Sequence, residues 1–140
     1  MNNLKIYVMI FIGAIGSVTS KIIGGWTNDA ITLLYCMLAD LTLGVIISLL
    51  FRKSPKTQSG GINSNIFIKG FFKKICMLIM VGVGFRMDIL LGLGYIRTGV
   101  VLSLILNEII SITENIGIMG VPLPKKLKNA IDILQKKEGE

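Results

Sequence analysis

The chain has 140 residues and a formal net charge of +7, from 15 lysines and arginines against 8 aspartates and glutamates. Apolar residues make up 52% of it, and its mean hydropathy of +0.73 is high for a chain of this length. Histidine is absent, and the two cysteines, Cys36 and Cys76, fall in apolar segments, where free thiols are expected. The composition predicts a membrane protein and argues against an enzyme, a metal site or a cofactor.

Four apolar segments follow one another along the chain, at residues 6–25, 30–51, 75–95 and 99–120. Each is close to the ~20 residues that an α-helix needs to cross a hydrocarbon core ~30 Å thick. We therefore predict an all-α, polytopic membrane protein with three or four transmembrane helices, and favour four. The expected transmembrane domain covers residues 1–121, and a basic tail follows at residues 122–140.

The first segment has a second interpretation. Lys5 and the apolar run from Ile6 to Ile15 loosely fit a secretory signal peptide. The apolar stretch resumes after Lys21, however, and a short glycine-containing turn leads directly into the second segment. We therefore expect this segment to be retained. Whether it crosses the bilayer completely, and on which side the N-terminus lies, are open at this point.

The distribution of charge predicts the orientation. The linker at residues 52–74 has 6 basic residues and no acidic one, and the tail has 5 lysines against 3 acidic residues. Short basic loops stay in the cytoplasm, so both regions are expected there. An even number of membrane crossings must then separate the linker from the tail. The third and fourth segments meet that requirement and place the C-terminus in the cytoplasm.

The basic residues of the linker and tail are also candidates for contact with anionic lipids. Aromatic residues and lysines alternate over residues 65–74, which indicates an approach helix at the inner interface. Apolar residues recur in the tail at i, i+3, i+4 and i+7, which favours a short amphipathic helix over a solvated tail. Because topology already explains these charges, no nucleic-acid partner is expected. The headgroup candidates are Lys69, Lys73, Lys74, Lys125, Lys126 and Lys128.

Two apolar segments carry polar residues on one face. Asp40 lies near the middle of the second segment, where an aspartate costs about 2.5 to 3.5 kcal/mol on insertion and should seek a partner. Gly44 and Ser48 follow it at four-residue spacing. The fourth segment contributes Asn107, Glu108, Ser111, Glu114 and Asn115. Two interpretations stay open: this face packs within one chain, or it meets other subunits or water after assembly.

No motif indicates catalysis. Glu108 and Glu114 are six residues apart, so they point to different sides of a helix. The Gly82-x-Gly84 and Gly92-x-Gly94 pairs lack the third glycine and the strand-to-helix context of a dinucleotide-binding loop. They indicate flexible or closely packed points of a membrane helix instead.

The order of these features resembles the phage lysis and toxin-secretion holins. Similar motifs are Asp40-Leu-Thr-Leu-Gly44-Val45, the linker run from Asn63 to Lys74, Asp88 near the end of the third segment, and the block from Asn107 to Leu127 with its Pro-x-Pro-Lys-Lys ending. Leu43 and Phe67 depart from the family pattern, where threonine and glycine are usual. The resemblance covers roughly residues 28–134 and leaves the first segment without a motif.

The resemblance implies a protein that oligomerises with itself in the bacterial cytoplasmic membrane and opens lesions. An endolysin, or a toxin in some relatives, then passes out, without necessarily binding the holin. The residues alone lead only to a small polytopic protein that self-associates. A small four-helix multidrug or ion transporter and an antiholin-like regulatory subunit are the alternatives.

Overall fold

The computed structural model describes residues 2–56, 58–61 and 63–138. Throughout these residues the regular structure is helical, which confirms the predicted all-α class. The helices are α1 (Asn3–Ile23), α2 (Asn28–Ile46), the short π-helix η1 (Ile47–Phe51), α3 (Ser64–Leu91), α4 (Ile96–Ile118) and α5 (Lys125–Glu138). Expected and observed helix ends differ by a few residues in α2 and α4.

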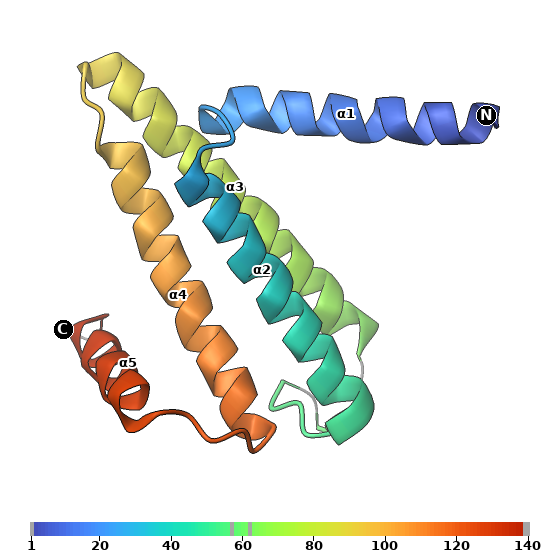
Figure 1. The fold of residues 1–140 in the computed structure, drawn as a ribbon, viewed down its shortest axis with the longest axis vertical. Helices are drawn as coiled ribbons and strands as arrows, with labels where there is room; N and C mark the ends of the chain where they lie inside the picture. The colour runs from blue at the N-terminus through green and yellow to red at the C-terminus, as the bar shows by residue number, and fades with distance from the viewer. Residues whose placement is uncertain (1, 57, 62, 139–140) are drawn as a thin grey trace.

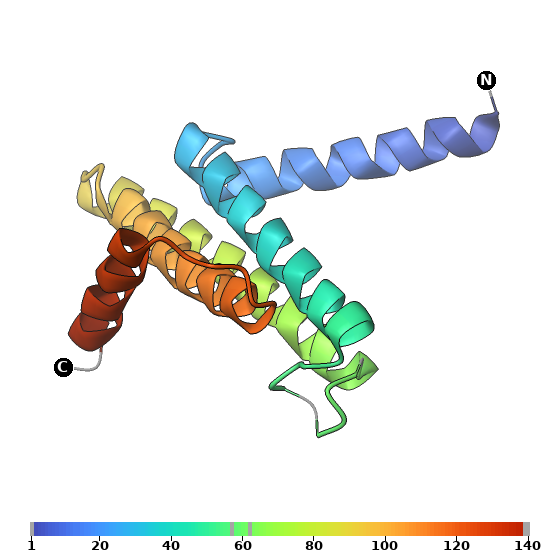
Figure 2. The same ribbon diagram turned by 60° about the horizontal axis from the view of Figure 1, so that its bottom comes forward.

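Helices α2, α3 and α4 run side by side and form a three-helix bundle (Figures 1 and 2). Helix α4 packs against both α2 and α3. Apolar side chains at helical spacing build the core between them. Its members are Ile23, Ala30, Leu33, Met37, Met77, Val81 and Val101. The amphipathic pattern of each helix therefore determines which side of it faces the bundle axis.

Two glycines of α3 allow its neighbours to approach closely. A Cβ atom at Gly82 would lie 2.9 Å from Cγ2 of Ile22, and one at Gly84 would lie 3.2 Å from Cα of Arg97. The first contact brings in the end of α1, and the second brings in the start of α4. The Gly82-x-Gly84 pair is therefore a close-packing point of α3, as one of the two interpretations of the sequence indicated.

Helix α1 projects away from the bundle and contacts it only near its C-terminal end, where it packs against α3 (Figures 1 and 2). Every residue from Ile6 to Ile12 is exposed. Seven consecutive residues cover two turns, so all sides of this helix offer apolar surface. Such a surface is suited to lipid or to another protein chain, and not to water.

Three helical stretches of the described chain are long and apolar enough to cross a membrane: α1, residues Asn28–Phe51 and α4. Helix α3 differs, because its uninterrupted apolar run at residues 75–85 covers only about 16 Å at ~1.5 Å per residue. Lys74 precedes this run and Arg86 follows it. The expected interfacial approach helix and third segment are in fact one continuous helix. The number of crossings stays a prediction.

The linker and the C-terminal end of α4 lie at the same end of the bundle, the lower end in Figure 1. Helix α5 follows after Pro122 and Pro124 and confirms that the tail is helical. Of its expected apolar face, Ile131 is buried, whereas Leu127 is exposed.

A buried ion-pair cluster and a polar cavity

Lys74 joins the three helices of the bundle through two ion pairs. Its Nζ atom lies 2.8 Å from Oδ2 of Asp40 on α2 and 2.5 Å from Oε2 of Glu108 on α4. All three side chains are largely buried, with 10%, 11% and 3% of their surfaces exposed. Removing one member of such a group leaves an uncompensated buried charge, so the cluster ties each helix to the other two.

The other carboxylate oxygen of Asp40 is bound from α4. Oδ1 accepts hydrogen bonds from Oγ of Ser111 at 2.5 Å and from Nδ2 of Asn115 at 3.0 Å. Ser111 and Asn115 are one helical turn apart, so both point toward α2. Among the described residues, no buried side-chain nitrogen or oxygen lacks a hydrogen-bond partner. Each buried polar atom of the cluster therefore has a hydrogen-bond partner inside one chain.

A cavity of about 160 Å³ opens beside the cluster, between α2, α3, α4 and the linker. The cavity is large enough to hold water, since one molecule needs roughly 10 to 15 Å³ of such volume. Besides the cluster, its polar wall includes Ser48, whose Oγ donates to the carbonyl of Gly44 at 2.9 Å, and Asn107. The lower wall is formed by the linker residues Ser54, Pro55 and Lys56.

The structure brings together most of the polar residues that the sequence singled out. Of the predicted polar-face residues, those that line this cavity are Asp40, Gly44, Ser48, Asn107, Glu108, Ser111 and Asn115. Glu114 is not among the lining residues, and its side chain is exposed. Within one chain the structure thus realises the first interpretation, in which the polar faces of α2 and α4 pack against each other.

One lysine lies elsewhere than expected. Lys74 was expected to face lipid headgroups, but it is buried and paired with Asp40 and Glu108. The physical reason is that two carboxylates buried inside the bundle are strongly destabilising without a cation, whereas headgroups at the membrane surface are solvated by water. The remaining headgroup candidates are all exposed: Lys69, Lys73, Lys125, Lys126 and Lys128. Their contact with lipid stays a prediction.

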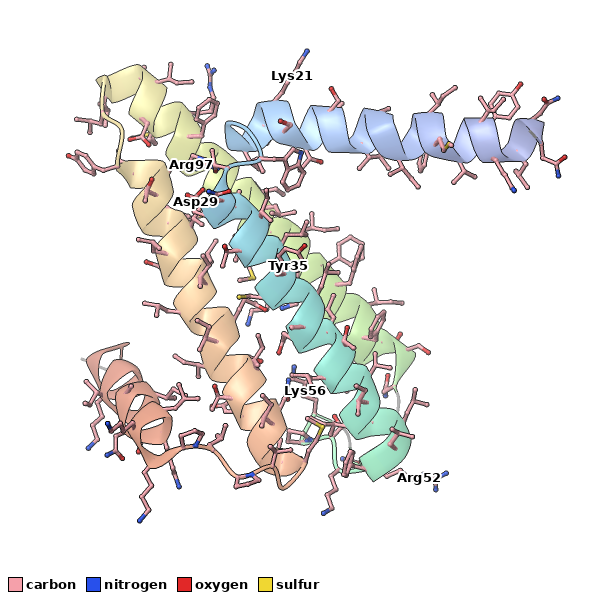
Figure 3. All side chains as sticks on the ribbon, viewed as in Figure 1. Lys21, Asp29, Tyr35, Arg52, Lys56 and Arg97 are labelled. Atoms are coloured by element: carbon pink, nitrogen blue, oxygen red, sulfur yellow. The ribbon has the colours of Figure 1, made fainter. Side chains whose placement is uncertain are left out.

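A second buried cluster, which the sequence did not reveal, surrounds Arg97 at the opposite end of the bundle. Its Nε donates to the carbonyl of Ile23 at 2.6 Å, and Nη1 lies 3.1 Å from Oδ2 of Asp29 (Figure 3). Nη2 donates to the carbonyl of Gly25 at 3.3 Å and to Oγ1 of Thr27 at 2.8 Å. Arg97 thus holds the turn between α1 and α2 against the start of α4. The only signal in the sequence was one arginine beside an apolar segment.

Asp88 fixes the neighbouring turn between α3 and α4. Its two carboxylate oxygens accept hydrogen bonds from the backbone N–H groups of Ile96 and Arg97, each at 2.9 Å. These are the first N–H groups of α4, which have no partner within the helix. A carboxylate at a helix N-terminus also interacts favourably with the helix dipole. The aspartate near the end of the third segment is therefore a cap for the fourth.

The arrangement as a whole is one of charge pairing and helix packing. Among the described residues, no group of three or more histidine, cysteine, aspartate or glutamate side chains could hold a metal ion. The cavity lies inside a helical bundle with apolar outer surfaces, and its ionisable groups bind one another. The geometry therefore defines a small helical membrane protein with a paired polar interior.

Comparison with known proteins identifies the family. Residues 17–136 match the bacteriophage holin family, and the chain belongs to that family. Holins are in general not enzymes. The resemblance seen in the sequence is thereby confirmed, and the chain is a holin-like membrane protein.

Relatives from Clostridium perfringens and Halalkalibacterium halodurans extend over nearly the full chain. An uncharacterized 14.9 kDa protein from the nagH 3' region of Clostridium perfringens is 36% identical over 140 residues, covering 99% of this chain and 100% of the relative. An uncharacterized protein of Halalkalibacterium halodurans is 33% identical over 132 residues, covering 90% and 92%. An uncharacterized protein of Listeria monocytogenes is 40% identical over 82 residues, covering 58% and 59%. No solved structure matches the chain.

Proposed function

We propose that the protein is a holin that oligomerises in the bacterial cytoplasmic membrane and opens lesions, which release an endolysin or a toxin and lead to lysis of the cell. The observation that carries this proposal is the match to the holin family over residues 17–136. The structure supports it with exposed apolar surface all around α1 and with polar side chains gathered inside the bundle.

The polar interior suggests how a lesion is lined. A hole large enough for a protein needs polar walls, because polar groups facing hydrocarbon are costly. In the isolated chain the polar faces of α2 and α4 point at each other across the cavity. We propose that assembly separates these faces and turns them toward water and neighbouring copies. Asp40, Glu108, Ser111 and Asn115 would then exchange partners within one chain for partners in the oligomer.

The basic regions support an orientation with the linker and tail in the cytoplasm. Both lie at the same end of the bundle, as an even number of crossings between them requires (Figure 1). There the exposed lysines of α3 and α5 would face the anionic inner leaflet, to which each contributes about 1 kcal/mol. The endolysin or toxin passes through the lesion and needs no binding site on the protein.

Induced expression in bacteria, with a cytoplasmic endolysin present, tests the proposal. We expect normal growth and membrane potential at first, then a sudden synchronised collapse with release of a cytoplasmic enzyme. Selective proton-coupled drug resistance without collapse would instead identify a small transporter. Delay of lysis by a co-expressed holin, with no lysis by this chain alone, would identify an antiholin.

A further inference from the structure

The buried ion-pair cluster is not electrically neutral by itself. It contains two carboxylates, from Asp40 and Glu108, and one ammonium group, from Lys74. With both carboxylates ionised, one negative charge is left over inside an apolar bundle. An uncompensated buried charge is strongly destabilising, so a further cation is expected nearby.

Lys56 is placed to supply that cation. Its exposed side chain lines the same cavity as the cluster, and its charge acts on that of Asp40. Figure 3 shows Lys56 between the lower ends of α2 and α4, whereas Arg52 points away from the bundle. Lys73 also lines the cavity. Its side chain leaves α3 in a different direction from that of Lys74, because successive residues of a helix are ~100° apart.

The linker backbone holds Lys56 in this place. The N–H of Ser54 donates to the carbonyl of Gly60 at 3.1 Å, which closes the turn that contains Lys56. Gly60 has a φ of +69°, and a Cβ atom there would lie 1.8 Å from the carbonyl oxygen of Arg52. Only glycine fits at this point. The turn is thus folded back tightly beneath the cavity, with Ser54, Pro55 and Lys56 forming its lower wall.

We infer that Lys56 is the second counter-ion of the Asp40–Lys74–Glu108 cluster and that it latches the linker turn over the linker-side mouth of the cavity. The latch closes the polar interior in the monomer. If the proposed holin function holds, on which this consequence rests, release of the latch precedes the separation of α2 and α4. Loss of Lys56 then advances the time of lesion formation.

The latch can be tested without relying on lysis. Ser48→Cys, in a background with Cys36→Ala and Cys76→Ala, places a single thiol in the cavity wall. In nanodiscs, Lys56→Gln should raise the rate of its reaction with a polar maleimide by roughly threefold to fivefold, the size expected for a partly exposed ion pair. Lys53→Gln, in the same linker but outside the cavity wall, is the matched control and should leave the rate unchanged.

A double-variant cycle shows whether charge balance is the cause. Glu108→Gln leaves one carboxylate and one ammonium group, so the Lys56→Gln effect should disappear in that background. Equal rates for Lys56→Gln and Lys53→Gln, or an undiminished Lys56→Gln effect beside Glu108→Gln, would overturn the inference. Lysis timing of the same variants is measured separately. A chain that never causes lysis refutes the holin function, while the maleimide rates still decide on the latch.

Discussion

Lys74 is the residue that joins all three helices of the bundle, and its loss would leave two buried carboxylates without their shared cation. Replacing a whole buried ion pair with apolar groups is often neutral, whereas removing one partner is costly. Asp40 keeps Ser111 and Asn115 as partners without Lys74, but within the described part of the chain Glu108 forms an ion pair with that lysine alone. The two carboxylates would then lie inside the bundle without the ammonium group that now binds both of them.

We therefore expect Lys74→Gln to destabilise the protein by about 3 to 5 kcal/mol, the range for breaking a buried ion pair. Denaturant unfolding in detergent micelles, followed by circular dichroism, measures this change. Lys69→Gln, an exposed lysine of the same helix, is the control and should change stability by less than ~0.5 kcal/mol. Similar stabilities for the two variants would mean that the cluster does not hold the bundle together.

The need for this cluster could be predicted from sequence, but its membership could not. A single aspartate in the middle of an apolar segment requires a partner, and the spacing of Ser111 and Asn115 placed them on one helix face. Lys74 belongs to a run of basic residues that membrane topology explains equally well. Only the packing of α3 against α4, with α2 nearby, selects Lys74 from that run. Arg97 was also missed, because its contacts with Ile23 and Asp29 form only when the helices pack together.

At the scale of the elements, we expect α5 to influence the time of lysis. It starts directly after Pro122 and Pro124, so its position is tied to the end of α4. Its exposed lysines, if they bind the inner leaflet, restrain that end of α4. The tail would then slow any rearrangement of the bundle.

Replacing Lys125, Lys126 and Lys128 together with Gln should remove about 3 kcal/mol of attraction to an anionic surface, at about 1 kcal/mol for each lysine. We expect the time of lysis to shift, with protein level and membrane insertion unchanged. The triple Arg variant preserves the charge and should keep the original timing. If the Gln variant triggers on schedule, the tail is an anchor and no more.

Periodicity and length predicted α2 and α4 to within a few residues, because each is a single apolar segment. The direction in which α1 projects from the bundle could not be predicted from the sequence. A helix that is apolar on all sides has no stripe to indicate its contacts, so nothing in its pattern says whether it lies beside the bundle. The continuity of α3 was also missed, since Lys73 and Lys74 separated the expected approach helix at residues 65–74 from the third apolar segment at residues 75–95.

For the whole molecule, the arrangement of the ends predicts the topology. The linker and the tail lie at one end of the bundle, and the turn between α3 and α4 lies at the other (Figure 1). Because the first two regions are basic, we expect both in the cytoplasm. The turn between α3 and α4 should then face outward.

Single cysteines test this topology in a background without Cys36 and Cys76. At Lys53 and Lys136 they should resist an impermeant thiol reagent in intact cells and react after permeabilisation. At Tyr95, which is 67% exposed in the opposite turn, a cysteine should react in intact cells. Labelling of only one of the two basic sites in intact cells would contradict the even number of crossings.

The position of Asp40 along the chain has a consequence for biosynthesis. Ser111 is encoded 71 residues after Asp40. At ~5 to 20 residues per second, translation takes about 4 to 14 s to reach it. Lys74 is the first partner to be made, and until then the aspartate of α2 has none of the partners that bind it in the folded chain. The mean hydropathy of 2.2 in the most apolar part of Asn28–Phe51 exceeds that of the other two candidate spans. The most apolar span is thus the one that carries a carboxylate whose partners are made later.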